Sequence, residues 1–524
     1  MDAPDGYEPG LPTEEGPVDP TQESLWMATS SGPARPALRG AERYDVAVLG
    51  AGITGMTAAL LLKREGLRVA VLEAGAVCQG VTGHTTAKVT SLHQLVYAEL
   101  ASRFDDDTAR VYGEANEAAI ALVALLVADY GIDCAWERRP AVTFTEREDE
   151  VDQVRAEAET AARVGLPARL VTDTDLPFPV RAAVQFDGQG QFHPRDYVLG
   201  LAEQVAGDGC AVYEHSRVVD VRDGDPCRVE TPEGSVEASS VIVATHLPLL
   251  DRGLFFAKAH PSRSYALAAT VEGPLPDGMY INVEQPTRSV RPYVRGATRM
   301  VVVSGEGHKP GEDEDEARHW DALAEWTRRH FAVISVDYLW SAQDYTPVDK
   351  IPFVGKVTRT SSNIWTATGF RKWGMTGGTA AAMILADLVA GRDNPWAATF
   401  DANRVTPVQS ARSFVTENLD VARHFVADRI TEPEDAEAAE RLGPGEGTVV
   451  RIDGTAYAVC RDDDGALYAL SPVCRHMGCH VRWNTAERSW DCPCHGSRYT
   501  PDGRVIQGPA VHDLEPRELP ERGS

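Results

Sequence analysis

The sequence predicts a large α/β domain, an α+β domain interleaved with it along the chain, and a small all-β domain at the C-terminal end. Three observations indicate this. A β–α–β pattern begins near residue 44, strand-like and helical patterns alternate from there to about residue 395, and the last part of the chain consists of short strand-like runs separated by turns. Alternating strands and helices are typical of α/β domains, and closely spaced short strands are typical of all-β domains.

Length and charge limit the function classes. A chain of 524 residues exceeds one ordinary hydrophobic core, so several domains are expected. The formal net charge of −27 disfavours binding to nucleic acids or to an anionic membrane surface, which select basic proteins. We find no apolar run long enough to predict a membrane span, and the first residues lack the basic and apolar parts of a secretion signal. We therefore expect a cytoplasmic protein with no nucleic-acid partner and no membrane span.

The N-terminal segment differs in composition from the β–α–β unit that follows it. Residues 1–40 are rich in Pro, Gly, Glu and Ser, which predicts a disordered tail. The apolar run that starts at Tyr44 predicts a buried parallel strand. Residues 53–64 then predict a helix, and residues 68–73 predict the second strand.

Farther along, helical and strand-like patterns exchange several times. Residues 99–159 predict helices, and residues 376–389 predict a further helix. Strand-like runs occur at 211–221, 240–244, 265–271, 300–304 and 363–369. Residues 426–446 turn acidic and then rich in Pro and Gly, which predicts a linker to the C-terminal domain, residues 447–524.

A glycine-rich turn, Gly50-Ala51-Gly52-Ile53-Thr54-Gly55, joins the first strand to the first helix. In such a turn the first glycine makes the bend, the second lets a pyrophosphate approach the backbone, and the third allows close packing of helix on strand. The helix N-terminus offers N–H groups to phosphate, and Glu73 at the end of the second strand can accept both ribose hydroxyls. The unit therefore predicts a dinucleotide site, and no second fingerprint of this kind is found.

Beyond this turn, residues 44–395 resemble the FAD-dependent oxidoreductases of the D-amino-acid oxidase and sarcosine oxidase type. The resemblance rests on residues 82–88, on Ser216-Arg-Val218, on the strand end Val241–Thr245, and on a Trp, Asp and Pro pattern over residues 340–355. It implies an oxidoreductase unit over residues 41–425, with a Rossmann-like FAD-binding domain in segments 41–110, 180–260 and 350–395 and a substrate domain between them. The cofactor-binding residues it implies are Gly50, Ala51, Gly52, Ile53, Thr54, Gly55, Glu73, Thr85, Thr86, Val218, Thr245, Gly369, Gly374, Met375 and Thr376.

The turn over residues 369–376 lies, by this resemblance, at the pyrimidine edge of the flavin. A helix N-terminus there stabilises negative charge on the reduced flavin, and Lys372 either adds a positive charge or is a solvated loop residue. Trp373 packs on the flavin or fills the core. His84 takes an active-site role, a covalent bond to FAD or a structural hydrogen bond. Lys372, Trp373 and His84 are the candidate catalytic residues. The family's Gly-x-Gly-His-Gly pattern and its carboxylate-binding arginine are not found, which argues against a simple amino-acid oxidase.

Four of the nine cysteines lie close together near the C-terminal end, in the motifs Cys474-Arg-His476-Met-Gly-Cys479 and Cys492-Pro-Cys494-His495. Each motif offers one Cys and one His as ligands. Two thiolates on one iron and two imidazoles on the other form a [2Fe–2S] cluster of the Rieske type. The candidate ligands are Cys474, His476, Cys492 and His495. The same residue types at these spacings also suit a structural zinc ion.

Residues 447–514 resemble the Rieske proteins of respiration and photosynthesis beyond these ligands. The resemblance implies a disulfide between Cys479 and Cys494, which is unusual in a cytoplasmic protein. It also implies that the hydroxyl groups of Ser497 and Tyr499 donate hydrogen bonds to sulfur atoms at the cluster. Such donors stabilise the added electron, so a high reduction potential is expected.

The two cofactors together predict an oxidoreductase that takes electrons from a small substrate in pairs and releases them singly. The leading hypothesis is hydride transfer from an amine or amino-acid derivative to FAD, with single electrons passing to the cluster and then to an acceptor, which is a protein carrier, a quinone or O₂. The alternatives are an oxidase that uses O₂ and an electron-transfer or redox-sensing module that exchanges electrons with a protein partner. A Rieske-type oxygenase is disfavoured because no second iron site of two His and a carboxylate is found.

Overall fold

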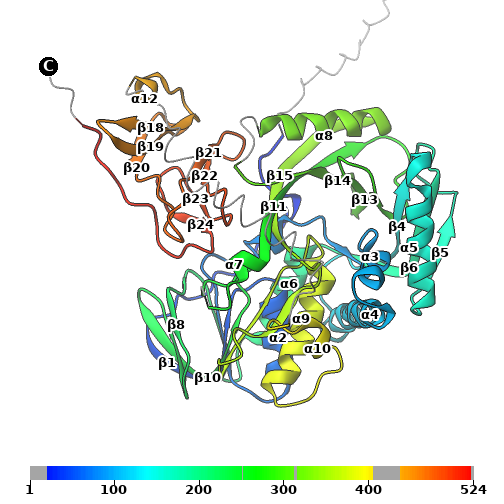
Figure 1. Ribbon diagram of the computed structural model, residues 1–524, viewed down its shortest axis with the longest axis horizontal. Helices are drawn as coiled ribbons and strands as arrows, with labels where there is room; N and C mark the ends of the chain where they lie inside the picture. Colours follow the sequence, from blue (N-terminus) through cyan, green and yellow to red (C-terminus); the bar gives the residue numbers. More distant parts are fainter. Residues whose placement is uncertain (1–19, 251, 312–315, 405–436, 521–524) are drawn as a thin grey trace, which may run out of the picture.

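The computed structural model describes residues 20–250, 252–311, 316–404 and 437–520, which form two large sheets and two small ones (Figure 1). The first large sheet contains the predicted β–α–β unit: β1 pairs in parallel with β2 and with β10. Its strands are β16 (Phe353–Lys356), β17 (Ile364–Thr368), β10 (Gly234–Val243), β1 (Gly40–Leu49), β2 (Val69–Leu72) and β7 (Ala211–Tyr213) in this order, with β9 (Cys227–Glu230) beside β10 and β8 (Asp220–Arg222) beside β9.

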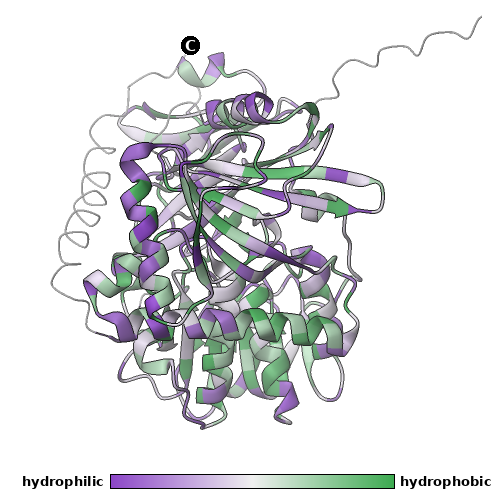
Figure 2. Ribbon diagram, turned by 90° about the vertical axis from the view of Figure 1, so that its right-hand side faces the viewer, coloured by the Kyte–Doolittle hydropathy of each residue, from purple (hydrophilic) through white to green (hydrophobic). Residues whose placement is uncertain are grey.

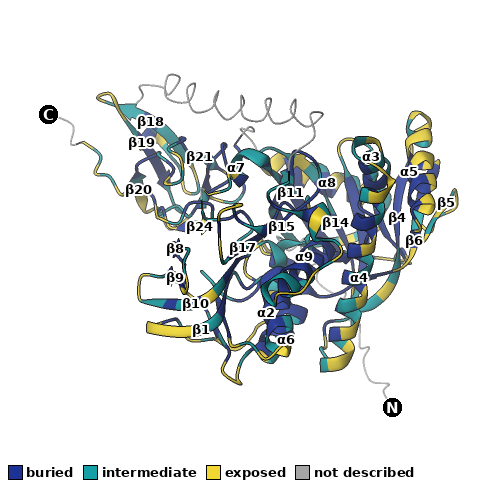
Figure 3. Cartoon of the chain, turned by 60° about the horizontal axis from the view of Figure 1, so that its bottom comes forward, coloured by how far each residue is buried: buried dark blue, intermediate teal, exposed yellow. Residues whose placement is uncertain are grey.

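Helices cover one face of this sheet. They are α2 (Ile53–Arg64), which has the predicted bounds, α6 (Pro194–Val205) and α9 (Gly374–Val389). Alternate residues of the central strands enter two different cores. Val46 and Val48 of β1 pack against the helices, whereas Ala47 and Leu49 pack on the other face with β8 and β9. Figure 3 shows that α2 and α9 are largely buried, whereas β1 is exposed along its first part and buried only toward its carboxyl end.

The second large sheet has nine strands and is mostly antiparallel. Its order is β15 (Val333–Pro347), β11 (Ala259–Val271), β14 (Thr298–His308), β13 (Arg288–Arg295), β12 (Met279–Asn282), β4 (Glu137–Thr145), β6 (Ala182–Gln191) and β3 (Lys88–Val89), with β5 (Ala168–Val171) beside β6. Helix α8 (Ala317–His330) buries Trp320 and Leu323 against one face of it. Helices α3 (Val96–Arg103), α4 (Asp106–Tyr130) and α5 (Val151–Arg163) complete this part of the chain. In Figure 2, hydrophobic and hydrophilic residues alternate along the outer helices, as expected where one side of a helix packs on the protein.

Three predicted boundaries are wrong because strand pairing joins segments far apart in the sequence. β3 and β6 fall inside segments predicted for the FAD-binding domain, yet they pair with each other in the second sheet. β4 interrupts the helical prediction over residues 99–159, and its pairing with β6 and β12 determines its structure. The strand predicted over residues 211–221 ends at Tyr213 and resumes at Asp220. Such tertiary pairing overrides local propensity.

The disordered tail predicted over residues 1–40 is wrong for its described part, residues 20–40. Helix α1 (Leu25–Ala28) is capped by Ser24, and the side chains of Leu25 and Trp26 are fully buried. The indole Nε1 of Trp26 donates to the Thr85 carbonyl at 2.6 Å. Two apolar side chains that pack on a distant part of the chain are enough to order a segment whose average composition is polar.

The C-terminal domain is all-β, as predicted. One sheet contains β18 (Gly447–Ile452), β19 (Thr455–Arg461) and β20 (Leu467–Leu470), and the other contains β21 (Arg482–Asn484), β22 (Ser489–Asp491), β23 (Arg498–Tyr499) and β24 (Val505–Gln507). Most of the predicted linker, 426–446, lies outside the described residues. Its last part is not a free linker, because α12 (Ala438–Arg441) buries Ala439 against Val450 and Tyr457.

Among the described helices, α4 is long and apolar enough to cross a membrane by length and composition. Half of its most apolar window is buried inside the protein, where α4 packs against α9 and α3. One such helix is weak evidence for a span, because a buried core helix has the same length and composition.

Candidate functional site

The glycine-rich turn lies at the carboxyl end of β1, where side chains larger than hydrogen do not fit. Gly50 has a φ of 101°, and a Cβ there would lie 2.6 Å from the Ala244 carbonyl oxygen. A Cβ on Gly55 would lie 1.9 Å from the Gly50 carbonyl oxygen, so the third glycine brings α2 onto the turn. Helix α2 starts after Gly52, which has no capping side chain, and the Ile53 N–H donates to Thr82 Oγ1 at 3.2 Å. The other N–H groups of the first turn fit the predicted pyrophosphate.

Glu73 ends β2 beside this turn and organises the backbone around it. Its Oε2 accepts from the Ala51 N–H at 2.8 Å and its Oε1 accepts from the Gly75 N–H at 2.9 Å. Burial raises the pKa of Glu73, and these backbone hydrogen bonds counteract that rise. Each carboxylate oxygen keeps a second lone pair, so Glu73 can still accept hydrogen bonds from ribose hydroxyls. The acid and the turn together fit the dinucleotide half of FAD.

Other predicted FAD residues lie around the same strand ends. The Thr245 backbone is next to Gly50, and Thr54 on α2 is in contact with Gly378 on α9. Val218 lies in the segment of the chain that connects β7 to β8, outside any strand, and its side chain is buried in a hydrophobic core. Thr85 and Thr86 lie in the segment that connects the 3₁₀ helix η1 (Val81–His84) to β3, and their carbonyl groups accept from Trp26 and Arg291.

The predicted turn at the flavin edge precedes α9 and has an unusual backbone. Gly369, Arg371 and Lys372 have φ values of 81°, 54° and 70°. Non-glycine residues rarely adopt such values and need external support, which comes here from β15. The Tyr345 carbonyl accepts from the Arg371 N–H at 3.1 Å, and the Asp344 carboxylate accepts from the Lys372 N–H.

Helix α9 begins at Gly374, again without a capping side chain. The backbone N–H groups of its first turn, from Gly374, Met375 and Thr376, can therefore bind oxygen atoms of a ligand. The Thr376 hydroxyl itself donates to the Thr90 carbonyl at 2.8 Å. Thr376 is thus placed to bind a cofactor through its backbone.

The three candidate catalytic residues do not form one cluster. Lys372 has an exposed side chain, and its Nζ donates to Ser264 Oγ at 2.5 Å. Trp373 stacks on His93, with ring centroids 4.6 Å apart. His84 forms a hydrogen bond between Nδ1 and the Gly80 carbonyl at 3.0 Å, and burial lowers its pKa.

Several polar residues near the turn were missed by sequence reasoning. His93 is buried between the Tyr112 hydroxyl and the Thr90 carbonyl, and burial lowers its pKa to about 3, so it is neutral. His246 donates from Nε2 to Asp344 Oδ1 at 2.8 Å. No local motif marks these histidines, because their partners come from distant parts of the sequence. The backbone φ of His246 is 69°, and no local sequence pattern predicts this value either.

The two predicted cluster-binding loops face each other in the C-terminal domain. In the first loop the Cys474 N–H donates to the Cys479 carbonyl at 2.8 Å, and in the second the Cys492 N–H donates to the Ser497 carbonyl at 2.8 Å. The imidazole rings of His476 and His495 lie 4.9 Å apart between centroids. Two cysteines and two histidines from facing loops fit a Rieske cluster.

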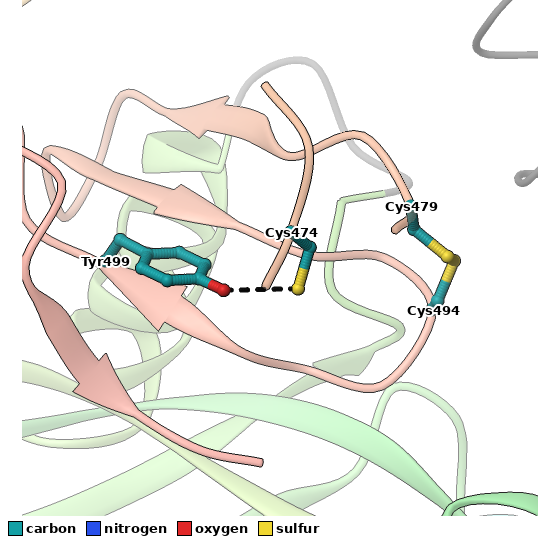
Figure 4. Close-up of a disulfide and its surroundings, with 4 residues drawn as sticks. All are labelled: Cys474, Cys479, Cys494 and Tyr499. Carbon is teal, nitrogen blue, oxygen red and sulfur yellow. Dashed lines mark hydrogen bonds between the residues drawn. A yellow bond between two sulfur atoms is a disulfide. The ribbon is translucent and has the colours of Figure 1, made fainter. Parts of the chain in front are cut away.

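Figure 4 shows the surroundings of these loops. Tyr499 Oη lies 3.2 Å from Cys474 Sγ and accepts from the Arg475 N–H at 3.2 Å, so its own hydrogen is free to point to the sulfur. Cys479 and Cys494 are joined at a sulfur–sulfur distance of 2.06 Å. Their sulfur atoms and that of Cys492 lie within 4.8 Å of one another, but the bonded pair is unavailable as thiolate ligands.

The two predicted histidine ligands lie beside a helix of the large domain. The Phe256 ring on α7 (Phe255–Lys258) lies 5.6 Å from the His476 ring and 5.1 Å from the His495 ring, between centroids. The Tyr345 hydroxyl donates to the His495 carbonyl at 2.8 Å. The cluster loops and the flavin-edge turn therefore share contacts with β15.

Comparison with known proteins supports both cofactor sites. A family model described as FAD dependent oxidoreductase matches residues 45–388, and one described as Rieske [2Fe-2S] domain matches residues 434–518. YhfW of Bacillus subtilis, named as a Rieske 2Fe-2S iron-sulfur protein, is 36% identical over 95% of this chain and 98% of its own length. The chloroplastic cytochrome b6-f complex iron-sulfur subunit of Arabidopsis thaliana is 46% identical over 86 residues, 15% of this chain and 38% of that subunit.

Solved structures show the same fold for the large domain. Glycine oxidase from Geobacillus kaustophilus has a TM-score of 0.59 at 19% identity and covers 70% of this chain and 100% of its own. L-amino acid deaminase from Proteus vulgaris has a TM-score of 0.58 at 19% identity and covers 72% of this chain and 97% of its own. The predicted cofactors, FAD and a Rieske [2Fe–2S] cluster, are confirmed, and the zinc alternative is set aside. The chain belongs to the FAD-dependent oxidoreductase family of the DAO type and carries a C-terminal Rieske [2Fe–2S] domain.

Proposed function

We propose that the protein oxidises a small amine or amino-acid derivative and transfers the electrons one at a time within the chain to its Rieske domain. FAD, when bound, takes a hydride from such a substrate and gives up electrons singly, which suits a one-electron cluster. The observation that carries the proposal is the position of Tyr345. Its hydroxyl donates to the His495 carbonyl at 2.8 Å and its own carbonyl accepts from the Arg371 N–H at 3.1 Å. One residue thus links the cluster loop to the flavin-edge turn.

A second hydrogen-bonded connection runs beside Tyr345. Gln507 of β24 donates from Nε2 to His246 Nδ1 at 3.0 Å, and His246 donates from Nε2 to Asp344 Oδ1 at 2.8 Å. Asp344 in turn accepts from the Lys372 N–H. These hydrogen bonds connect the strained turn to the C-terminal domain.

Two buried cations support a substrate that carries a carboxylate. Arg291 is 1% exposed, donates to the Thr86 carbonyl and lies over the Trp26 ring at 4.8 Å. Lys88 is 8% exposed and has no carboxylate partner among the described residues. Burial and the nearby charge of Arg291 together lower the pKa of Lys88 to about 7. A charge buried without a counter-charge is costly, so a bound carboxylate would stabilise the protonated form of Lys88. The similar structures named glycine oxidase and L-amino acid deaminase agree with this substrate class.

The test is an anaerobic titration of the holoprotein with glycine, L-proline, L-phenylalanine and their N-methyl derivatives. Flavin bleaching is followed by absorbance, and cluster reduction is followed separately by electron paramagnetic resonance. At least one compound should bleach the flavin and then reduce the cluster. The matched control, Cys474→Ser with Cys492→Ser, should keep flavin bleaching and lose the cluster signal. If no compound bleaches the flavin and a reduced protein donor does reduce the cluster, the proposed substrate oxidation is wrong. The alternative hypothesis of an electron-transfer module then replaces it.

A further inference from the structure

Four charged residues form a buried cluster between β11 and the Rieske domain, which we call the charge clamp: Arg263, Glu487, Asp491 and Arg498. Arg263 on β11 is fully buried, and its Nη2 lies 2.8 Å from Asp491 Oδ2 on β22. Arg263 also forms an ion pair with Glu487. Arg498 completes the clamp from β23, 2.7 Å from Glu487 Oε2 and 3.1 Å from Asp491 Oδ1. One of the four residues therefore comes from the large domain and three come from the Rieske domain.

The clamp pairs two arginines with two carboxylates. The charges of Arg498 and Arg263 keep the pKa of Glu487 below its ordinary value against the effect of burial. Ser341 Oγ donates to Glu487 Oε1 at 2.7 Å, which adds a neutral contact from β15. Lifting the Rieske domain away would break both ion pairs of Arg263 and leave Gln343, whose Oε1 accepts from Nη2 at 3.4 Å, as its partner on the large domain.

Close backbone contacts surround the clamp on the side of the cluster. Gln343 donates from Nε2 to the Gly496 carbonyl at 2.8 Å, and a Cβ on Gly496 would lie 2.3 Å from that nitrogen. On the other side, a Cβ on Gly311 would lie 3.0 Å from the Pro493 side chain. His495, next to Gly496, is 5% exposed beneath Phe256. The domains approach each other as closely as elements of one core do.

We infer that the Rieske domain works from this single docked position and that Arg263 is the positioning residue that holds it there. The inference rests on the proposed electron transfer between FAD and the cluster. In that step one electron leaves the reduced flavin and enters the oxidised cluster. With the histidine side turned toward the large domain beneath Phe256, the step needs no movement of the domain, and its distance is set by the clamp. Friction from the solvent should then have no effect on its rate.

The experiment is flash photoreduction of the flavin in the anaerobic holoprotein, with deazaflavin and a sacrificial amine as the reductant. The rate of cluster reduction is followed by absorbance at rising sucrose concentrations. The wild-type rate should be independent of viscosity. Arg263→Gln should slow it at least tenfold and make it fall as viscosity rises, because the domain must then find its docked position. The matched control is Arg169→Gln, whose ion pair with Asp187 is about half exposed on both sides. It should behave as the wild type.

Amide hydrogen exchange of the same holoproteins gives a readout that does not depend on electron transfer. In Arg263→Gln the amides of residues 489–498 should exchange faster, with the exchange of β1 and β2 unchanged. If Arg263→Gln does not fold, the double variant Tyr345→Phe with Gln343→Ala replaces it in both measurements. This double variant removes two hydrogen bonds to the Rieske domain and leaves both ion pairs of Arg263 in place. A viscosity-dependent wild-type rate, or variants that keep the wild-type rate and exchange, would overturn the inference. Absence of any electron transfer in the wild type would instead overturn the proposed function.

Discussion

Replacing Tyr499 with phenylalanine removes one hydroxyl group and so tests the electrostatics of the cluster site. Tyr499 is fully buried, and its hydroxyl lies 3.2 Å from Cys474 Sγ. The backbone N–H of Arg475 donates to the same oxygen at 3.2 Å, so the Tyr499 hydrogen is free to point to the sulfur. The ring of phenylalanine fills the same space. The change therefore removes a hydrogen bond and leaves the packing intact.

The magnitude follows from the charge on the sulfur. A hydrogen bond to a charged group is worth about 1.5–3 kcal/mol, and it strengthens when the cluster gains an electron. If about half of that energy distinguishes the reduced from the oxidised state, the difference is about 1 kcal/mol. For a one-electron couple about 1.4 kcal/mol corresponds to about 59 mV. We therefore expect the reduction potential of Tyr499→Phe to fall by about 40–60 mV.

The assay is a spectroscopically monitored redox titration of the full-length holoprotein. Tyr468→Phe is the matched control, because Tyr468 lies in the same domain and its hydroxyl interacts with Asp462 instead of the cluster sulfurs. The control should keep the wild-type potential. An unchanged or raised potential in Tyr499→Phe, with an intact cluster spectrum, would show that this hydroxyl does not donate to the sulfur.

Three further predictions concern FAD, the disulfide and pH. Glu73→Gln keeps the size of the side chain and should weaken FAD binding about tenfold, measured by flavin fluorescence on dilution; unchanged affinity would exclude a ribose contact. Cys479→Ser with Cys494→Ser should lower the free energy of unfolding by about 3 kcal/mol, since the bridge closes a loop with a sequence separation of 15. Two thiols that alkylate in the native wild-type protein would contradict the disulfide. Burial, with a further rise from the charge of Asp491, raises the pKa of Glu316 to about 8. The folded protein thus holds a proton that the unfolded chain releases, so stability falls between pH 6 and 8, by about 2 kcal/mol, and Glu316→Gln should remove most of this loss in thermal denaturation.

The cluster motifs and the glycine-rich turn could be predicted because the residues that carry their chemistry are close together in the sequence. Cys474 and His476 are two positions apart and lie in one loop, whatever surrounds that loop. Gly50 needs its positive φ for a bend that the flanking strand and helix already imply. In these cases local spacing and local backbone geometry are sufficient, and the structure places the residues as expected.

The contacts between the domains could not be predicted in the same way. His246 and Asp344 are 98 positions apart, and Arg263 and Glu487 are 224 positions apart. Nothing in the composition near either residue indicates its partner. The segment around Trp26 shows the same limit, since its polar composition predicts disorder whereas one buried indole anchors it to Thr85.

The sequence by itself thus determined the two cofactors, the β–α–β unit that receives FAD and the four residues expected to hold the cluster. Only the tertiary structure decided which strands belong to which sheet, that Tyr345 joins the cluster loop to the flavin-edge turn, and that Arg263 is buried beneath the Rieske domain. The physical reason is the range of the interactions. Turns, caps and ligand motifs depend on neighbours a few residues away, whereas sheet pairing and buried ion pairs depend on free energies gained when distant segments meet.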